Sequence, residues 1–390
     1  MHKIYWTCSL WVTFTAVFVL AAACNDNGNG LGELPANVGY LRASSSGESS
    51  LTIFDADTFE IYRTVKLPPA LIIHSHRLEI GPDGRIWIGS SQAGIDRLIR
   101  KKDRVLVFSP QGNLEHELDL GCNRPYPGIA FANGYAFIGC SASGFYGRMI
   151  VVDTATMQTV KTFDKVHPPD QDPLDKHFHL NLVAEVAGLI LVIGKGSPPR
   201  DYQRLTSHSA PDTRIGVLDP QTLEFRGYLT GFEPGLRIKS VQEVDGKAWL
   251  FNELSHLEER PPRVDVYVVD PATLRVVDRF NLERPFPRWT ARADQATIYI
   301  AHVARFKRLR DAGYQSGITR LDLTTGAETF WPTPDMPYPH WIGVQQGRPC
   351  IVESKKEGGG LWCMSDHSKL ELKIPQERAV GAVFSNTVLQ

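Results

Sequence analysis

The sequence lacks the short motifs that mark several large enzyme classes. It contains no G-x-S-x-G, no H-E-x-x-H, no G-x-x-x-x-G-K-[ST] and no C-x-x-C-H. These absences exclude the nucleophile elbow of serine hydrolases, the zincin helix, the P-loop and a c-type haem site. The chain also lacks an excess of one charge, because its net charge is −1. We therefore expect no nucleic-acid partner and no membrane binding through bulk charge.

Long hydrophobic runs are also scarce, and the one at the N-terminus predicts a targeting segment. Leu10 to Ala23 is almost wholly apolar and follows the positive charge of Lys3. The run is too short for a membrane span and ends in small residues, so residues 1–23 are predicted to be a signal peptide. The stretch Leu20 to Cys24 resembles the lipobox of bacterial lipoproteins, which implies that Cys24 is lipidated. Residues 21–23 also fit an ordinary A-x-A cleavage site, which would release a soluble protein.

The 14 residues after the signal peptide predict a tether. Residues 24–37 are rich in Asn and Gly, a composition typical of flexible linkers. We expect a lipid-anchored protein of the bacterial cell envelope that faces the periplasm or the exterior, with a soluble periplasmic or secreted protein as the alternative. Residues 38–390 are predicted to form a single domain.

Four cysteines remain after the signal peptide and Cys24 are set aside, and an envelope protein meets an oxidising compartment. Cys350 and Cys363 flank a predicted hairpin centred between Lys356 and Glu357, so the two side chains should lie opposite each other and form a disulfide. A bridge between Cys122 and Cys140 stays open. Neither pair has the spacing of a metal site.

Seven copies of one pattern occupy the predicted domain. Each is a short apolar strand, an Asp or Ser, two or three small residues, a Thr or Gly, and a second strand. The copies begin at Ile53, Val107, Val151, Gly216, Tyr267, Thr319 and Trp362. A repeat of roughly 50 residues that contains only strands predicts a β-propeller with one repeat per four-stranded blade.

The remaining strand pairs complete the blades and predict how the ring closes. Six further pairs of strands are joined by tight turns such as Asp83-Gly84, Asn133-Gly134 and Asp245-Gly246, which favour two-residue hairpins. The seventh pair would combine Val380 to Phe384, as an inner strand, with Val38 to Arg42. The sequence thus predicts an all-β, seven-bladed propeller of four antiparallel strands per blade, closed by strands from both termini.

Long connections fall on one predicted face and carry a basic excess. Fourteen cations against eight anions lie in these loops, so we expect this face to bind a partner, although basic loops also serve solubility alone. The cations are Arg97, Arg100, Lys101, Lys102, Arg200, Arg204, Arg260, Arg263, Arg305, Lys307, Arg308, Arg310, Lys355 and Lys356.

A row of polar residues is predicted at the mouth of the central channel on that face. The residue seven places before each inner-strand turn is, in chain order, Arg77, Pro127, Asn181, Lys239, Arg288 and His340, with Val380 in the last strand. His76, Glu79, His179, Trp289 and Trp341 lie beside this row. Cations presented with Trp and His suit an anionic or carbohydrate-like ligand. The alternative is that these groups only hydrate the channel or pair with Glu79.

No cofactor is predicted. Two H-x-H pairs, His74 with His76 and His177 with His179, are the places where a divalent metal would bind if they lay on strands. At loop ends such pairs seldom bind one, so the sequence favours no metal.

The repeats resemble those of a known group of propellers. Val151 to Val160 and Val268 to Val277 are similar to the repeats of YVTN-type propellers, in the group of the quinoprotein amine dehydrogenase heavy chain. His76 to Ile88 is similar to a repeat of the streptogramin lyase and gluconolactonase propellers. The resemblance implies the fold from Val38 to the C-terminus. The lactonases hold a divalent metal with carboxylates and an Asn, for which this chain offers only Glu79 and Asn181, beside cations that would repel a metal.

Two functions are therefore expected from the sequence. The first is a monomeric binding or scaffold protein whose basic loops and channel mouth bind an anionic small molecule, a saccharide or an envelope protein. Its ligand contacts would be Arg77, Asn181, Lys239, Arg288, Trp289, His340 and Trp341. The second is a lactonase- or lyase-type enzyme at the channel mouth, with His76, Glu79, His179 or His340 as the base and nearby cations stabilising negative charge.

Overall fold

The computed structural model describes most of the predicted domain and little of the segment before it. The described ranges are 34–44, 49–68, 78–89, 104–121, 128–140, 148–164, 178–196, 215–232, 238–253, 264–304, 310–311, 313–336, 339–355, 358–365 and 369–385. Ala36–Gln390 forms one compact unit, and Met1–Pro35 forms a separate one. Within the described ranges, no helix has the length and apolar character needed to cross a membrane.

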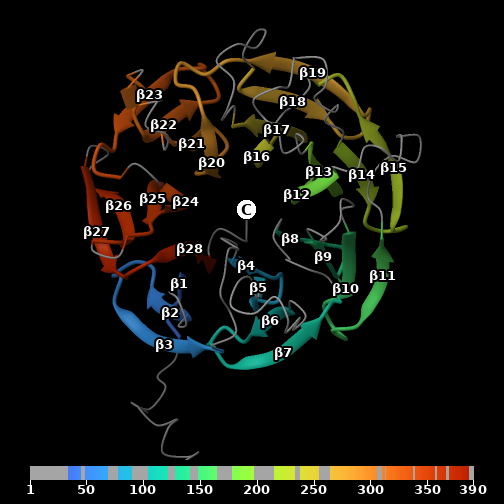
Figure 1. Ribbon diagram of the computed structural model, residues 1–390, viewed down its shortest axis with the longest axis horizontal. Helices are drawn as coiled ribbons and strands as arrows, with labels where there is room; N and C mark the ends of the chain where they lie inside the picture. The colour runs from blue at the N-terminus through green and yellow to red at the C-terminus, as the bar shows by residue number, and fades with distance from the viewer. Residues whose placement is uncertain are drawn as a thin grey trace, which may run out of the picture. The chain divides into compact units, whose positions relative to one another are not determined.

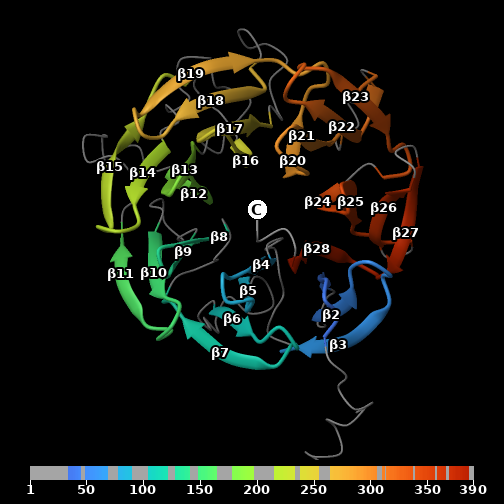
Figure 2. The ribbon, with the colours of Figure 1, turned by 180° about the vertical axis from the view of Figure 1, so that it is seen from behind.

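Seven four-stranded antiparallel sheets surround a central channel, as the sequence predicts (Figure 1). The first blade takes strands from both ends of the chain: β28 (Ala379–Phe384), β1 (Val38–Ser44), β2 (Ser49–Asp55) and β3 (Ile61–Leu67). In every blade the first strand of this order lies beside the channel and the last lies at the rim. Figure 2 shows the same order from behind.

The other six blades follow in chain order. The second has β4 (Leu78–Ile80), β5 (Ile86–Gly89), β6 (Arg104–Phe108) and β7 (Leu114–Asp119). The third has β8 (Ile129–Ala132), β9 (Tyr135–Cys140), β10 (Arg148–Asp153) and β11 (Thr159–Phe163). The fourth has β12 (Phe178–Val186), β13 (Leu189–Gly196), β14 (Ile215–Asp219) and β15 (Glu224–Leu229). The fifth has β16 (Ile238–Val244), β17 (Lys247–Asn252), β18 (Val266–Asp270) and β19 (Arg275–Phe280). The sixth has β20 (Pro287–Arg292), β21 (Thr297–His302), β22 (Gly317–Asp322) and β23 (Glu328–Pro332). The seventh has β24 (Pro339–Gln345), β25 (Arg348–Glu353), β26 (Gly360–Ser365) and β27 (Lys369–Pro375).

Ring closure by both termini is confirmed. β28 pairs antiparallel with β1, with Gly39 opposite Phe384 and Leu41 opposite Ala382. The backbone N–H of Val38 also donates to the hydroxyl of Ser385, at 3.0 Å.

The hydrophobic cores lie between neighbouring blades. The second and third strands of most blades are apolar runs that are buried on both faces, such as Ile86–Gly89 and Thr297–His302. Clusters of these side chains fill the spaces between the fourth and fifth blades, around Leu191 and Leu250, and between the seventh and first blades, around Leu41 and Val352. Outer strands alternate exposed and half-buried residues because only one face meets the core. Each blade therefore depends on its two neighbours for burial.

In five of the seven blades the Asp of the repeat shapes the turn before the outer strand. Asp55 accepts hydrogen bonds from the N–H groups of Asp57 and Thr58, both at 2.8 Å, and Asp153 does the same for Ala155 and Thr156. This local capping is why the sequence repeats Asp at the end of the third strand.

The predicted disulfide between Cys350 and Cys363 is present, across the paired strands β25 and β26. Cys140 is also disulfide-bonded. Cys122 lies outside the described residues, so the pairing of Cys122 with Cys140 stays a prediction.

Candidate functional site

The inner strands enclose a cavity of about 250 Å³ at the centre of the ring. Six of the seven inner strands contribute to its wall, all except β8. The lining residues are Leu78, Glu79, Leu182, Ala184, Ser240, Val241, Gln242, Trp289, Thr290, His340, Trp341, Ile342, Ala382 and Val383. Four of the residues predicted from the sequence, Glu79, Trp289, His340 and Trp341, are therefore brought together around one space.

The predicted row of channel-mouth residues coincides with an irregularity that recurs in the sheets. In four blades the pairing of the two inner strands shifts by one residue, at Asn181, Lys239, Arg288 and His340. The first blade shows the same shift at Val380. A bulge leaves one residue unpaired and re-aims its side chain. Five blades thus interrupt the ladder at one equivalent height, close to where each inner strand begins.

The charge of Arg288 is balanced by a residue that was not among those predicted from the sequence. Its Nη1 lies 3.2 Å from Oε1 of Glu253, and the two side chains are 6% and 3% exposed. Glu253 directly follows β17 of the neighbouring blade, so the ion pair joins the fifth and sixth blades. The charge of Arg288 is therefore balanced by Glu253.

The two predicted tryptophans and His340 form one side of the cavity. The guanidinium of Arg288 lies 5.7 Å from the ring centre of Trp289, within cation–π range. Burial and the nearby charge of Arg288 lower the pKa of His340 to about 4. The imidazole is therefore neutral at neutral pH, and the cavity wall here is aromatic and uncharged.

A polar network lies at the cavity between the fifth and sixth blades. The hydroxyl groups of Ser240 and Thr290 are 2.6 Å apart. The side-chain amide of Gln242 donates to the hydroxyl and to the carbonyl of Thr290, at 2.9 and 3.1 Å. These contacts fix the orientation of three side chains that line the cavity, so their remaining hydrogen-bonding capacity is preorganised.

A second polar row, on the second strand of three blades, was not predicted from the sequence. Asn252, His302 and Glu353 pair with the residue that precedes the register shift in the fifth, sixth and seventh blades, and each is at most 2% exposed. A signal for them exists, because each is the polar last residue of an otherwise largely apolar strand. Burial raises the pKa of Glu353 to about 7, although Lys355, at 3.7 Å, opposes the shift.

Several predicted residues lie outside the part of the chain that the structure describes. Arg77, His76, Cys24 and most of the basic loop residues lie outside the described ranges, as do the side chains of Asn181 and His179. Lys239 is half-buried beside Ser240. Within the described part of the chain, no three His, Cys, Asp or Glu side chains are grouped so as to hold a metal ion.

Comparisons with known proteins identify the fold and no family. No family model matches the chain, and no curated protein matches its sequence. Among solved structures 997 chains match, so the architecture is far too widespread to indicate an activity.

Three of these structures illustrate the range. A functionally unknown protein from Desulfotomaculum acetoxidans DSM 771 has a TM-score of 0.57 at 12% identity, covering 90% of this chain and 99% of that one. Dihydro-heme d1 dehydrogenase NirN in complex with DHE has a TM-score of 0.54 at 14% identity, covering 92% and 78%. A chain of the mitotic checkpoint complex has a TM-score of 0.52 at 10% identity, covering 91% and 86%. These likenesses show the β-propeller fold, and the seven sheets give the number of blades.

Proposed function

We propose that this protein is a binding protein of the bacterial cell envelope whose channel cavity holds a small polar ligand with at most one negative charge. The observation that carries the proposal is the repeated register shift beside a cavity walled by Trp289 and Trp341. Tryptophan faces stack on the apolar faces of sugar rings, and the fixed Ser240, Thr290 and Gln242 supply hydrogen bonds. A sugar or a sugar acid has both features.

Electrostatics limits the charge of the ligand. Arg288 is paired with Glu253, and His340 is neutral at neutral pH. The remaining charged residues of the described cavity region are Lys239 and Glu79, which carry opposite signs. A multiply charged anion would lose its hydration without full compensation there, whereas a monoanion or a neutral saccharide would not.

A tryptophan fluorescence titration with glucuronate, galacturonate, glucose and citrate tests this proposal. We expect a saturable signal with a sugar or sugar acid and none with citrate. Trp289→Phe and Trp341→Phe should each weaken binding by about threefold to tenfold, the value of an aromatic contact. Trp249→Phe is the matched control, because Trp249 packs on Phe280 away from the cavity. Equal weakening by all three variants, or no saturable signal, would contradict the proposal.

An enzyme of the lactonase or lyase type is the second candidate, because Glu79 and His340 line one cavity. A base with a pKa of about 4 accepts a proton poorly at neutral pH, which favours binding over catalysis. A screen against lactones and anionic sugars, with metal analysis of the purified protein, separates the two. Turnover that is lost in His340→Gln would establish the enzyme.

The basic loops form a second surface for a partner in this proposal. Of the cluster Arg305, Lys307, Arg308 and Arg310, only Arg310 is described, and its guanidinium donates to the carbonyl of Ala304 at 3.1 Å. Replacing all four by Ser should weaken the capture of an envelope partner by the full-length protein. An unchanged interaction profile would count against the loop surface and leave the cavity proposal standing.

The cell-envelope location rests on Cys24. If Cys24 is diacylated, the protein should sediment with membranes, and Cys24→Ser should move it to the soluble periplasmic fraction. Wild type and Cys24→Ser differ at this one residue, so the wild-type protein is the control. A wild-type protein already found in the soluble fraction would refute the lipid anchor.

A further inference from the structure

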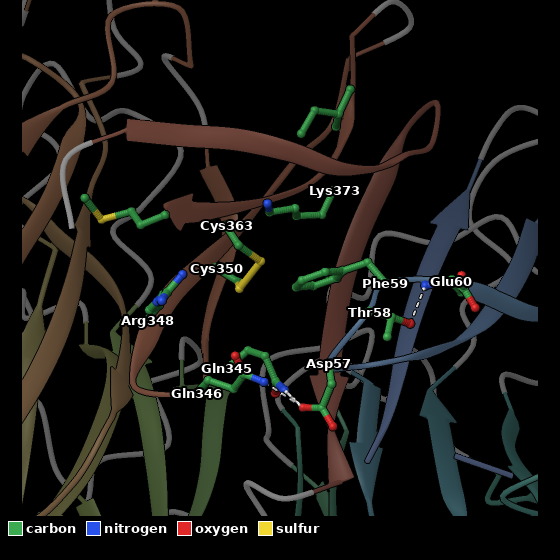
Figure 3. A pocket seen from close by; sticks show the side chains of 12 residues that line it. Asp57, Thr58, Phe59, Glu60, Gln345, Gln346, Arg348, Cys350, Cys363 and Lys373 are labelled. Carbon is green, nitrogen blue, oxygen red and sulfur yellow. Dashed lines mark hydrogen bonds between the residues drawn. A yellow bond between two sulfur atoms is a disulfide. The ribbon is translucent and has the colours of Figure 1, made fainter. Parts of the chain in front are cut away.

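A second cavity, of about 380 Å³, lies at the junction of the seventh and first blades (Figure 3). We call it the seam cavity. Its walls are the turn between β2 and β3 on one side and the strands β24 to β27 on the other. It shares no lining residue with the central cavity, and its volume is in the range of small-molecule sites.

One acidic group at the seam cavity is already fully engaged. Oδ1 of Asp57 accepts hydrogen bonds from the side-chain amides of Gln345 and Gln346, at 3.2 and 2.9 Å. Its other oxygen accepts from the amide of Asn37, at 2.6 Å. Asp57 therefore ties the first blade to the seventh.

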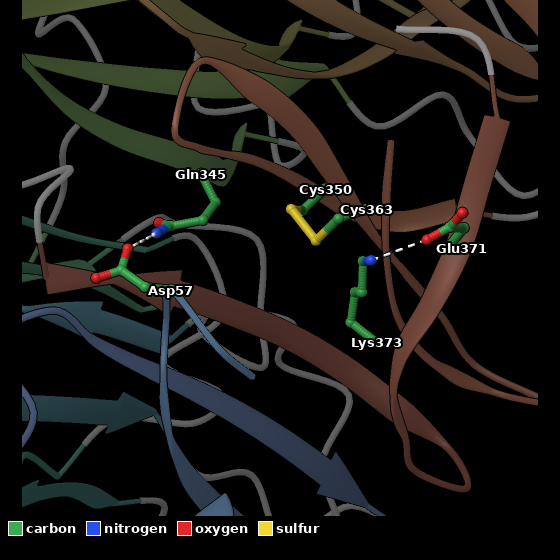
Figure 4. The surroundings of a disulfide bond; sticks show 6 residues. All are labelled: Asp57, Gln345, Cys350, Cys363, Glu371 and Lys373. Carbon is green, nitrogen blue, oxygen red and sulfur yellow. Dashed lines mark hydrogen bonds and ion pairs between the residues drawn. A yellow bond between two sulfur atoms is a disulfide. The ribbon is translucent and has the colours of Figure 1, made fainter. Parts of the chain in front are cut away.

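Polar residues line most of the seam cavity, and one part of its wall is apolar and contains sulfur. The disulfide between Cys350 and Cys363 lies against it, with the two residues 0% and 4% exposed (Figure 4). The half-buried ring of Phe59 faces the disulfide in Figure 3, and Leu372 adds an apolar side chain that is 36% exposed. An aromatic or branched aliphatic group would displace water here without losing hydrogen bonds.

Two cations border this apolar surface. Arg348 is exposed and forms no ion pair with any residue that the structure describes. The ammonium of Lys373 lies 5.8 Å from the ring centre of Phe59, and its ion pair with Glu371, at 2.9 Å, is partly exposed. Such exposed pairs are weak and exchange readily. In Figure 3, Glu60 lies beyond Thr58, on the side away from Arg348.

We propose that the seam cavity binds a small monocarboxylate with an aromatic or branched aliphatic body. The body contacts Phe59 and Leu372, and the carboxylate lies between Arg348 and Lys373. Arginine suits this role because its planar guanidinium can bind both carboxylate oxygens. This site is independent of the channel ligand proposed above.

Ligand-observed saturation-transfer NMR with phenylacetate, measured on the full-length protein, tests the proposal. Benzyl alcohol, which has a similar body without the charge, is the comparison ligand. We expect phenylacetate to bind more tightly than benzyl alcohol, and Arg348→Gln and Lys373→Met each to weaken phenylacetate about tenfold, as for a hydrogen bond to a charged group. Lys369→Met is the matched control, since Lys369 is an exposed lysine of the same strand, outside the cavity.

Three outcomes would overturn the proposal. They are equal binding of phenylacetate and benzyl alcohol, an equal effect of Lys369→Met and Lys373→Met, and no saturation transfer to phenylacetate from the wild-type protein. Trp341→Phe should leave phenylacetate binding unchanged, because Trp341 belongs to the central cavity. Loss of phenylacetate binding in that variant would assign the ligand to the channel instead.

Discussion

Single residues in several turns adopt a left-handed backbone conformation that costs free energy of folding. Four of the turns that join the first two strands of a blade place a non-glycine residue at φ near 50°, followed by glycine: Asn133, Ala187, Asp245 and Gln346. Asn and Asp tolerate this left-handed conformation because their short polar side chains bond locally, whereas alanine lacks that compensation. Ala187 is therefore the weakest member of the set.

Ala187→Asn should stabilise the protein by about 0.5–1 kcal/mol, because asparagine accepts the left-handed conformation at lower cost. Ala187 is exposed, so the larger side chain meets no packing constraint. Chemical denaturation measures the effect. Asp245→Ala, in the equivalent turn of the next blade, should destabilise by a similar amount. A loss of stability in Ala187→Asn would contradict this reading of the turn.

Glu353 should make stability fall as the pH rises from about 4.5 to 7. Its pKa in the folded protein, about 7, lies above that of an unfolded glutamate. The folded state therefore holds more protons than the unfolded state in this window, and rising pH favours unfolding. Glu353→Gln should be relatively more stable at pH 8 than at pH 4, by on the order of 1–3 kcal/mol.

The measurement is the difference in unfolding free energy between wild type and Glu353→Gln across this pH range. Taking the difference cancels the contribution of His340, which both proteins contain. The lowered pKa of His340 makes the stability of the folded state rise with pH, which is the opposite of the effect of Glu353. A flat difference would show that Glu353 titrates normally.

Residue-level predictions from the sequence succeeded where a repeat defined the position and failed where blades meet. Counting back from the turns located Lys239, Arg288 and His340, because strand geometry fixes that spacing. The partner of Arg288 did not emerge, because Glu253 belongs to another blade and its approach depends on how the blades pack. The burial of Glu353 did not follow from the inner-strand spacing, because Glu353 ends the second strand of its blade.

At the scale of elements, strand identity followed from the sequence better than strand length. The tight turns gave the ends of β12, β16 and β24, but their beginnings were obscured by polar residues. β20 starts at Pro287, because Arg288 and Trp289 continue the strand through a bulge. Alternation breaks at a bulge, so a pattern of period two stops there even when the strand does not.

The disulfide across β25 and β26 should contribute about 3 kcal/mol, because it closes a loop of 13 residues in the unfolded chain. The double variant Cys350→Ala/Cys363→Ala should show this loss in thermal unfolding. The variant is preferable to a reducing agent, since Cys140 is also disulfide-bonded and would be reduced too. Both thiols reacting with an alkylating reagent in unreduced, unfolded wild type would show that no bridge exists.

For the whole molecule, the ring depends on its last strand. Deleting Ala379 onward removes β28, which belongs to the core between the seventh and first blades with Ala379, Ala382 and Phe384. Several kcal/mol of apolar burial would be lost, at about 25 cal/mol per Å², against a total stability of about 5–15 kcal/mol. We expect the truncated protein to aggregate, as measured by light scattering.

A shorter truncation provides the control for this experiment. Deleting the residues after Ser385 leaves β28 and the hydrogen bond from Val38 to Ser385 in place. That protein should remain monomeric and melt like the full-length chain. If the longer truncation did the same, the contribution of β28 to the closed ring would be negligible.

Closure by both termini also sets an order on biosynthesis. β1, β2 and β3 leave the ribosome long before β28, with a delay on the order of half a minute for the intervening chain. During that interval the nascent first blade carries an open strand edge along β1, which is a template for pairing with other chains. The chain must therefore emerge in full before the first blade can close, so a factor that shields the N-terminal strands until β28 has emerged would improve the folded yield.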